Sequence, residues 1–144
     1  MSQSTSFWTN FGSNAAPLVL ASVIALSQPV SAWATVSDVD DASYKKEVEE
    51  ASLPVFIDFY ATWCNPCKRV SPIVDDLSDD YKGRIKFVRV DVDKAPKTAE
   101  RYSADELPTL LLRSKKLPRG VFVTGMKTKE QLKAFIEDAL KKVD

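Results

Sequence analysis

The sequence Phe-Tyr-Ala-Thr-Trp-Cys-Asn-Pro-Cys-Lys at residues 59–68 decides the fold of this chain. It overlaps the end of a dense apolar run at 55–60, which predicts a strand buried on both faces, as in a parallel sheet. After Cys67, apolar side chains recur at helical spacing as far as Leu77, and Gly83 suits a helix stop. The sequence therefore places a CxxC pair where a buried strand passes into a helix, which is a redox signature.

The flanking segments alternate between strand and helix patterns. Strands are predicted at 85–90, 109–112 and 120–124, and helices at 40–50 and 95–102. The last helix begins at the capping box Thr128-Lys-Glu-Gln131 and continues as an apolar stripe to Val143. This order predicts an α/β fold with a central mixed β-sheet and helices on both faces. Its parallel part comes from strand–helix–strand units, and its end is a hairpin.

The composition excludes several kinds of function. Lys plus Arg and Asp plus Glu each number 20, so the chain lacks the basic excess that nucleic-acid binding requires. There is no His, which excludes Ser–His and Cys–His catalysis. The two cysteines are too few for a structural zinc site, which needs four ligands. We expect no metal and no organic cofactor, because the electrons of a dithiol reside in its two sulfurs.

The chain has an uncharged leader at 1–34 ahead of a domain at 35–144. Residues 15–26 form an apolar run that suits the core of a signal peptide and is short for a membrane span. Ala32-Trp33-Ala34 fits a signal-peptide cleavage pattern, but no basic residue precedes the apolar run. Three interpretations stay open: a cleaved export or lumen-targeting signal, an uncleaved anchor, and a disordered or partial leader.

These interpretations predict different compartments. A cleaved signal engages a translocon and places the domain in an exported compartment, such as the periplasm or the thylakoid lumen. An anchor has its nearest basic residues, Lys45 and Lys46, on its C-terminal side. The positive-inside rule then places a membrane-anchored domain in the cytoplasm or the stroma.

The spacing of the two cysteines has a chemical reason. Cys64 at the helix start faces unpaired backbone N–H groups and the positive end of the helix dipole, which stabilise a thiolate. A thiol in such motifs falls from a pKa of about 8.5 to about 7. Cys64 is therefore the predicted nucleophile, Cys67 one turn later is the resolving thiol, and Pro66 stiffens the first turn. The alternatives are two inert buried thiols, or a metal or cluster shared between two chains.

Residues 35–144 resemble thioredoxin. The resemblance rests on the stretch 56–68, on Pro72, on Val90-Asp-Val-Asp93, on Leu107-Pro-Thr-Leu and on Gly125, all in the family's order. It implies the thioredoxin fold and a protein-disulfide reductase. It also implies a role for Asp58 as a buried proton acceptor for Cys67. A carboxylate in an otherwise apolar strand is expensive to bury, and burial raises its pKa.

The resemblance implies roles for further residues. Pro108 matches the family's cis-proline opposite the disulfide, with Leu107 offering its backbone to an extended substrate. Trp63, Asn65 and Gly125 are expected at the surface where substrates dock. The alternatives are a trans-proline in a loop at 108, an ordinary half-buried aromatic at 63 and a simple turn at 125.

Two other positions keep alternatives of their own. Asp58 is alternatively an edge-strand carboxylate that faces water. Arg89 matches a position where the family often has Lys near the buried carboxylate, and it is alternatively a solvated strand residue.

Three features depart from the family pattern. Asn65 stands where common thioredoxins have Gly, which leaves the redox potential open. Glu106 places negative charge near the groove, which opposes the thiolate and acidic partners. The hairpin turn at 113–119 is long and basic, and we predict that it is a solvated turn and not a docking site.

The sequence thus predicts a monomeric thiol-disulfide oxidoreductase that reduces disulfides in partner proteins. A reductase or a membrane electron donor would recharge the dithiol. The alternatives are a disulfide oxidant or isomerase in an exported compartment, and a non-catalytic binding module with the same fold.

Overall fold

The computed structural model describes residues 35–142, so the leader and the predicted helix end at Val143 lie outside the described residues. The elements follow in the order β1 (Ser37–Asp38), η1 (Lys45–Glu49), β2 (Val55–Tyr60), α1 (Asn65–Asp80), β3 (Lys86–Asp91), α2 (Pro96–Arg101), β4 (Thr109–Arg113), β5 (Val121–Thr124) and α3 (Lys129–Leu140). No helix in this part of the chain is both long enough and apolar enough to span a membrane. The division of the chain at residue 34 stays a prediction.

Within residues 35–142 the strands form one mixed sheet in the order β1-β3-β2-β4-β5. β3 runs parallel to its neighbours β1 and β2, whereas β4 is antiparallel to both β2 and β5. Strand β2 therefore lies at the centre, as its run of apolar residues, interrupted by Asp58 alone, predicts. The register places Asp58 of β2 between Arg89 of β3 and Leu110 of β4.

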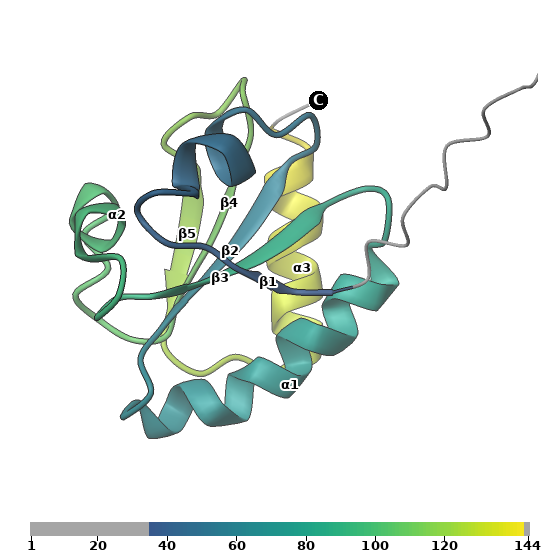
Figure 1. Ribbon diagram of the computed structural model, residues 1–144. Helices are drawn as coiled ribbons and strands as arrows, with labels where there is room; N and C mark the ends of the chain where they lie inside the picture. The colour runs from purple at the N-terminus through teal and green to yellow at the C-terminus, as the bar shows by residue number, and fades with distance from the viewer. Residues whose placement is uncertain (1–34, 143–144) are drawn as a thin grey trace, which may run out of the picture. The chain divides into compact units, whose positions relative to one another are not determined.

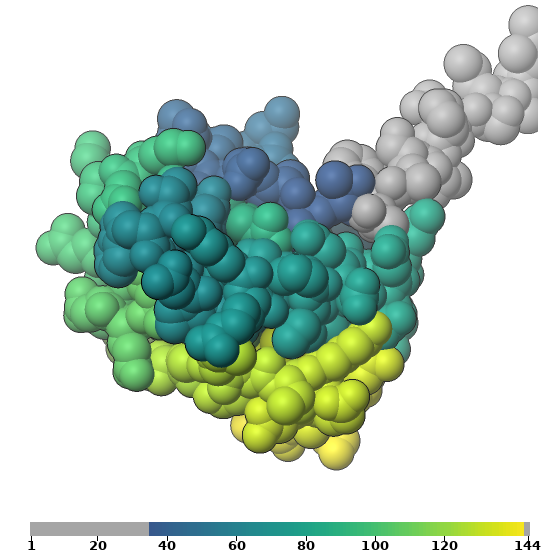
Figure 2. Space-filling view, turned by 90° about the horizontal axis from the view of Figure 1, so that it is seen from below, coloured from purple at the N-terminus to yellow at the C-terminus, as the bar shows by residue number. Residues whose placement is uncertain are grey.

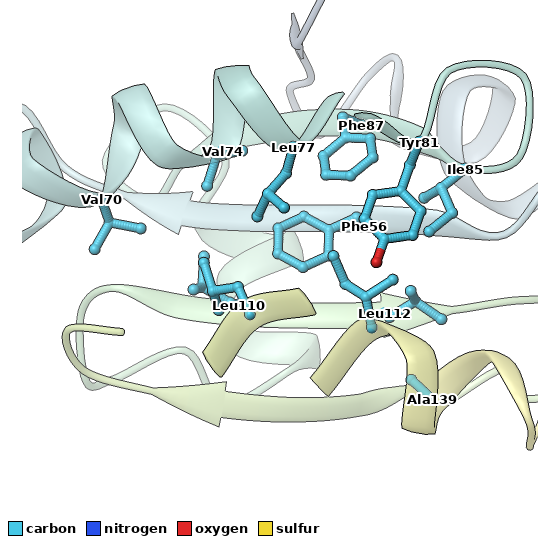
Figure 3. Close-up of a cluster of buried hydrophobic side chains, with 12 residues drawn as sticks. Phe56, Val70, Val74, Leu77, Tyr81, Ile85, Phe87, Leu110, Leu112 and Ala139 are labelled. Carbon is cyan, nitrogen blue, oxygen red and sulfur yellow. The ribbon is translucent and has the colours of Figure 1, made fainter. Parts of the chain in front are cut away.

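Helices cover both faces of the sheet, which confirms the predicted fold class (Figure 1). On one face, α1 and α3 pack against Phe56 and Leu110, and Figure 3 shows Phe56 beside Leu77 of α1. On the other face, Ile57 lies in a second core with Val48 of η1. Successive residues of β2 alternate between the two cores because side chains of a strand point to opposite faces in turn. By the same alternation Asp58 lies on the face that α1 covers.

Most predicted elements lie within a residue or two of their observed bounds, but the N-terminal segment differs. The predicted surface helix at 40–50 is a turn at 41–43 followed by the π-helical turn η1, closed by a hydrogen bond from Glu50 N–H to Lys45 O of 3.0 Å. Strand β1 was not predicted, since two exposed residues carry no alternation pattern. It pairs with β3 only because the fold brings it to that edge.

The hairpin between β4 and β5 corrects another prediction. Arg113 does not belong to a solvated turn, because it is the last residue of β4 and only 6% exposed. Its guanidinium donates to two backbone carbonyls, which hold it against the protein. The turn closes at Gly120, whose positive φ of 70° and close neighbours in β4 suit glycine alone.

Helix α3 begins as predicted. Thr128 accepts a hydrogen bond from the N–H of Gln131, and the Gln131 side chain accepts one from the N–H of Thr128. This reciprocal capping box satisfies two backbone donors that the helix itself leaves unpaired. The buried stripe is formed by Leu132, Ile136 and Ala139.

Candidate active site at the start of helix α1

The two cysteines form a disulfide at the point where β2 leads into α1. Their sulfurs are 2.08 Å apart and their Cα atoms 5.3 Å apart. Cys64 is 4% exposed and Cys67 is 2% exposed, so both are buried in this oxidised form. Both pack in a small cluster with Ala61, against which Leu107 also lies.

The local sequence explains why the pair sits at the helix start. Cys64 is the N-cap of α1, and its Sγ accepts a hydrogen bond of 3.2 Å from the N–H of Cys67. That N–H has no partner within the helix, so it is available to a sulfur. Pro66 in the first turn has no N–H to satisfy, and Asn65 beside it is exposed. A thiolate on Cys64 would be stabilised by this donor and by the helix dipole.

Asp58 lies in the central strand and is 1% exposed, so it is not an edge carboxylate facing water. Its Oδ1 atom has no hydrogen-bond partner within residues 35–142. Loss of hydration raises the pKa of Asp58 to about 6, although the nearby Arg89 guanidinium acts in the opposite direction. This carboxyl can therefore gain or lose a proton close to neutral pH.

Arg89 is the partner of Asp58 and not a solvated strand residue. Its Nε donates to Oδ2 of Asp58 at 3.3 Å, and its Nη2 donates to Oδ1 of Asp75 on α1 at 3.1 Å. The Arg89 side chain is 20% exposed, whereas that of Asp75 is 57% exposed. The guanidinium thus joins the buried carboxylate to one at the surface, and it links β2, β3 and α1.

Two segments distant in sequence meet next to the dithiol. The peptide bond between Leu107 and Pro108 is cis, and the Pro108 carbonyl accepts a hydrogen bond of 2.9 Å from the N–H of Gly125. Leu107 lies between the cysteine cluster and the core behind it. Gly125 has a positive φ of 74°, which glycine adopts without strain.

Trp63 supplies an apolar surface beside the disulfide. Its side chain is 66% exposed, and its Nε1 donates to Oδ2 of Asp93 at 2.9 Å. Figure 2 shows this end of the domain, with the start of α1 in teal between the green segment that follows β3 and the yellow segment of α3. An exposed aromatic ring fixed by one hydrogen bond suits contact with another protein.

Two carboxylates at the site were not singled out from the sequence. Asp75 stands beside Asp76 on α1, and nothing local distinguishes the one that reaches Arg89. Asp93 lies in the Val-Asp-Val-Asp segment at 90–93 that carries part of the family resemblance, which was the available signal. Within the described residues, 35–142, no group of three or more acidic or cysteine side chains is arranged to hold a metal ion.

A mixed sheet that carries a dithiol at the N-terminus of a helix, with the residue before a cis-proline packed against the two cysteines, defines a thiol-disulfide oxidoreductase. The Thioredoxin family model matches residues 35–138, and the chain belongs to the thioredoxin family.

Curated relatives agree with this assignment. A thioredoxin of Synechocystis sp. is 45% identical over 74 residues, which span 51% of this chain and 69% of the relative. A thioredoxin of Pyropia yezoensis is 45% identical over 78 residues, which span 54% and 73%. One of Rickettsia felis is 42% identical over 76 residues, which span 53% and 72%.

Proposed function

We propose that this protein reduces disulfide bonds in partner proteins. The observation that supports a role as a reductant is the buried Asp58. Its Oδ1 atom accepts no hydrogen bond within residues 35–142, and its pKa is about 6. A reductant must convert its resolving thiol into a thiolate while a substrate is bound. A carboxylate that takes up a proton near neutral pH serves that step.

The reaction has two sulfur exchanges. The Cys64 thiolate attacks one sulfur of the substrate disulfide, the substrate S–S bond breaks, and one substrate thiolate leaves and takes a proton. Cys67 then gives its proton to Asp58 and attacks Sγ of Cys64, which breaks the mixed disulfide and releases the second substrate thiolate. Two electrons pass to the substrate and the Cys64–Cys67 disulfide forms. A reductase or a membrane electron donor restores the dithiol.

The substrates are proteins with an accessible disulfide. The exposed Trp63 ring, Asn65 and the backbone of Leu107 beside the cis-proline would contact an extended substrate segment. Glu106 is exposed near this edge and disfavours acidic substrates. For the leader we propose targeting to an exported or lumenal compartment, and the N-terminal residue of the mature protein tests this. A mature chain that retains residues 1–34 would favour the anchor.

The redox midpoint of the cysteine pair in the full-length chain tests the direction of electron flow. Thiol alkylation in glutathione or dithiothreitol buffers reports this pair alone, because the chain contains no other cysteine. We expect a midpoint near about −270 mV, as in thioredoxin. A value of about −120 to −180 mV would reverse the proposed direction and favour an oxidant or isomerase. Absence of a reversible two-electron transition would favour the binding module.

Trapping of substrates tests the roles of the two thiols. Cys67→Ser keeps the attacking thiol and removes the resolving one, so mixed disulfides with substrates should accumulate. Cys64→Ser is the matched control and should trap none. If Cys64→Ser captured substrates as well as Cys67→Ser does, the assignment of nucleophile would be wrong.

A further inference from the structure

A cavity of about 850 Å³ lies between the β4–β5 turn, η1 and the end of α2. Its volume is within the range of about 300–1,000 Å³ that is typical of small-molecule sites. The cavity and the dithiol lie at opposite ends of β4. Arg113, which lines the cavity, pairs with Val55 at the start of β2, whereas Thr109 pairs with Phe59 near the end of β2, where the dithiol loop begins. These positions are four residues apart, or roughly 13 Å along the strand.

The wall of the cavity contains a buried cation. Arg113 is 6% exposed, its Nη1 donates to Val48 O at 2.7 Å, and its Nε donates to Pro118 O at 3.2 Å. Both partners are neutral, and no carboxylate of residues 35–142 forms an ion pair with Arg113. Buried charges in proteins are normally paired. An anion in the cavity would supply the missing partner.

The other charged residues of the cavity leave it positive. Arg119 is exposed and forms no ion pair in the described part of the chain, whereas Arg101 is paired with Glu49. Three arginines and one glutamate thus give the lining a formal charge of +2. Guanidinium groups match the geometry of phosphate oxygens, which they bind through two parallel hydrogen bonds.

Aromatic rings complete the lining. Phe122 of β5 is 64% exposed, which is unusual for a large apolar side chain and places its ring at the cavity. Tyr44 and Tyr102 also line it, and their rings are tilted with centroids 6.2 Å apart. Tyr44 is buried, so Phe122 is the exposed ring of the three, and an exposed ring next to arginines suits a ligand with a planar ring, because stacking on an aromatic side chain tolerates many ring types.

We propose that this cavity binds a small organic phosphate with a planar ring, a ligand of the nucleotide class. Arg113 and Arg119 hold the phosphate, and Phe122 contacts the ring. The site does not involve the dithiol and does not depend on the direction of electron flow proposed above.

Titration calorimetry on the full-length chain tests the proposal, with ADP as the probe and with inorganic phosphate and adenosine as separate probes of its phosphate and nucleoside parts. We expect ADP to bind more tightly than inorganic phosphate or adenosine alone, and we expect its affinity to fall as salt is added. Arg119→Gln lies on an exposed turn and should weaken ADP binding by at least about tenfold. Phe122→Ser should weaken the binding of ADP without affecting the binding of inorganic phosphate. Lys115→Gln removes the same charge from the same turn outside the cavity and should leave binding within about twofold.

Arg113 needs a separate variant because its removal also breaks two backbone contacts. Arg113→Lys keeps the charge and loses the planar fork, so ADP binding should fall while the circular dichroism spectrum and disulfide reduction stay those of the wild type. The proposal is overturned if millimolar ADP does not bind, or if Lys115→Gln weakens binding as much as Arg119→Gln. It is also overturned if inorganic phosphate or adenosine alone binds as tightly as ADP.

Discussion

Replacement of the buried carboxylate by Asp58→Asn should stabilise the protein at neutral and higher pH. The side chain keeps its shape and loses a charge that is 1% exposed. The pKa of Asp58 is about 6 in the folded chain against an ordinary value of 3.8. At about 1.4 kcal/mol for each pH unit, this difference corresponds to about 3 kcal/mol of unfolding free energy.

The sign follows from proton binding. Between pH 4 and pH 6 the folded protein holds a proton on Asp58 that the unfolded chain has released. The wild type should therefore lose about 3 kcal/mol of stability as pH rises through this window, with the loss complete by about pH 8. Asp58→Asn lacks the titrating group, so its stability should not show this fall.

Urea unfolding of the disulfide form, followed by circular dichroism at pH 4 and pH 8, measures most of the effect without thiol titration. Asp75→Asn is the matched control, because it removes the other carboxylate bound to Arg89 from an exposed position. It should change stability by less than about 1 kcal/mol at either pH. The reasoning is refuted if Asp58→Asn is less stable than the wild type at pH 8, or if the two proteins show the same pH dependence.

Three further outcomes are expected from the structure. Arg89→Gln removes the cation that holds down the pKa of Asp58, so the pH-dependent fall in stability should shift to higher pH; an unchanged midpoint would contradict the pairing. Gly120→Ala should lower the unfolding free energy in urea by at least about 2 kcal/mol, because the added Cβ would lie 2.7 Å from a β4 carbonyl oxygen. The control Gly83→Ala also has a positive φ, but its Cβ meets nothing within 4 Å, so it should cost about 1 kcal/mol. Equal costs would count against this packing. Thr128→Ala should lower the unfolding free energy measured in urea by about 1 kcal/mol through loss of the α3 cap, and Thr128→Ser should restore most of it.

The elements with strong local signals were predictable. Strand β2 is apolar except for Asp58, α3 has a capping box and an apolar stripe, and the CxxC pair marks the start of α1. Each signal depends on residues only a few positions apart. The π-helical turn η1 was not predictable from its apolar spacing, since Tyr44 and Val48 are four apart and suit an α-helix equally well.

The sequence by itself determined the family, the order of the elements and the position of the dithiol, because motif spacing and hydrophobic period are local properties. Only the tertiary structure decided which charged side chains are buried and desolvated. Asp58 and Arg113 both stand in strands, but the one meets Arg89 and the other meets two backbone carbonyls. Desolvation and ion pairing depend on which segments pack together across the sheet, and that long-range arrangement sets the pKa of Asp58 and leaves Arg113 without an acidic partner among residues 35–142.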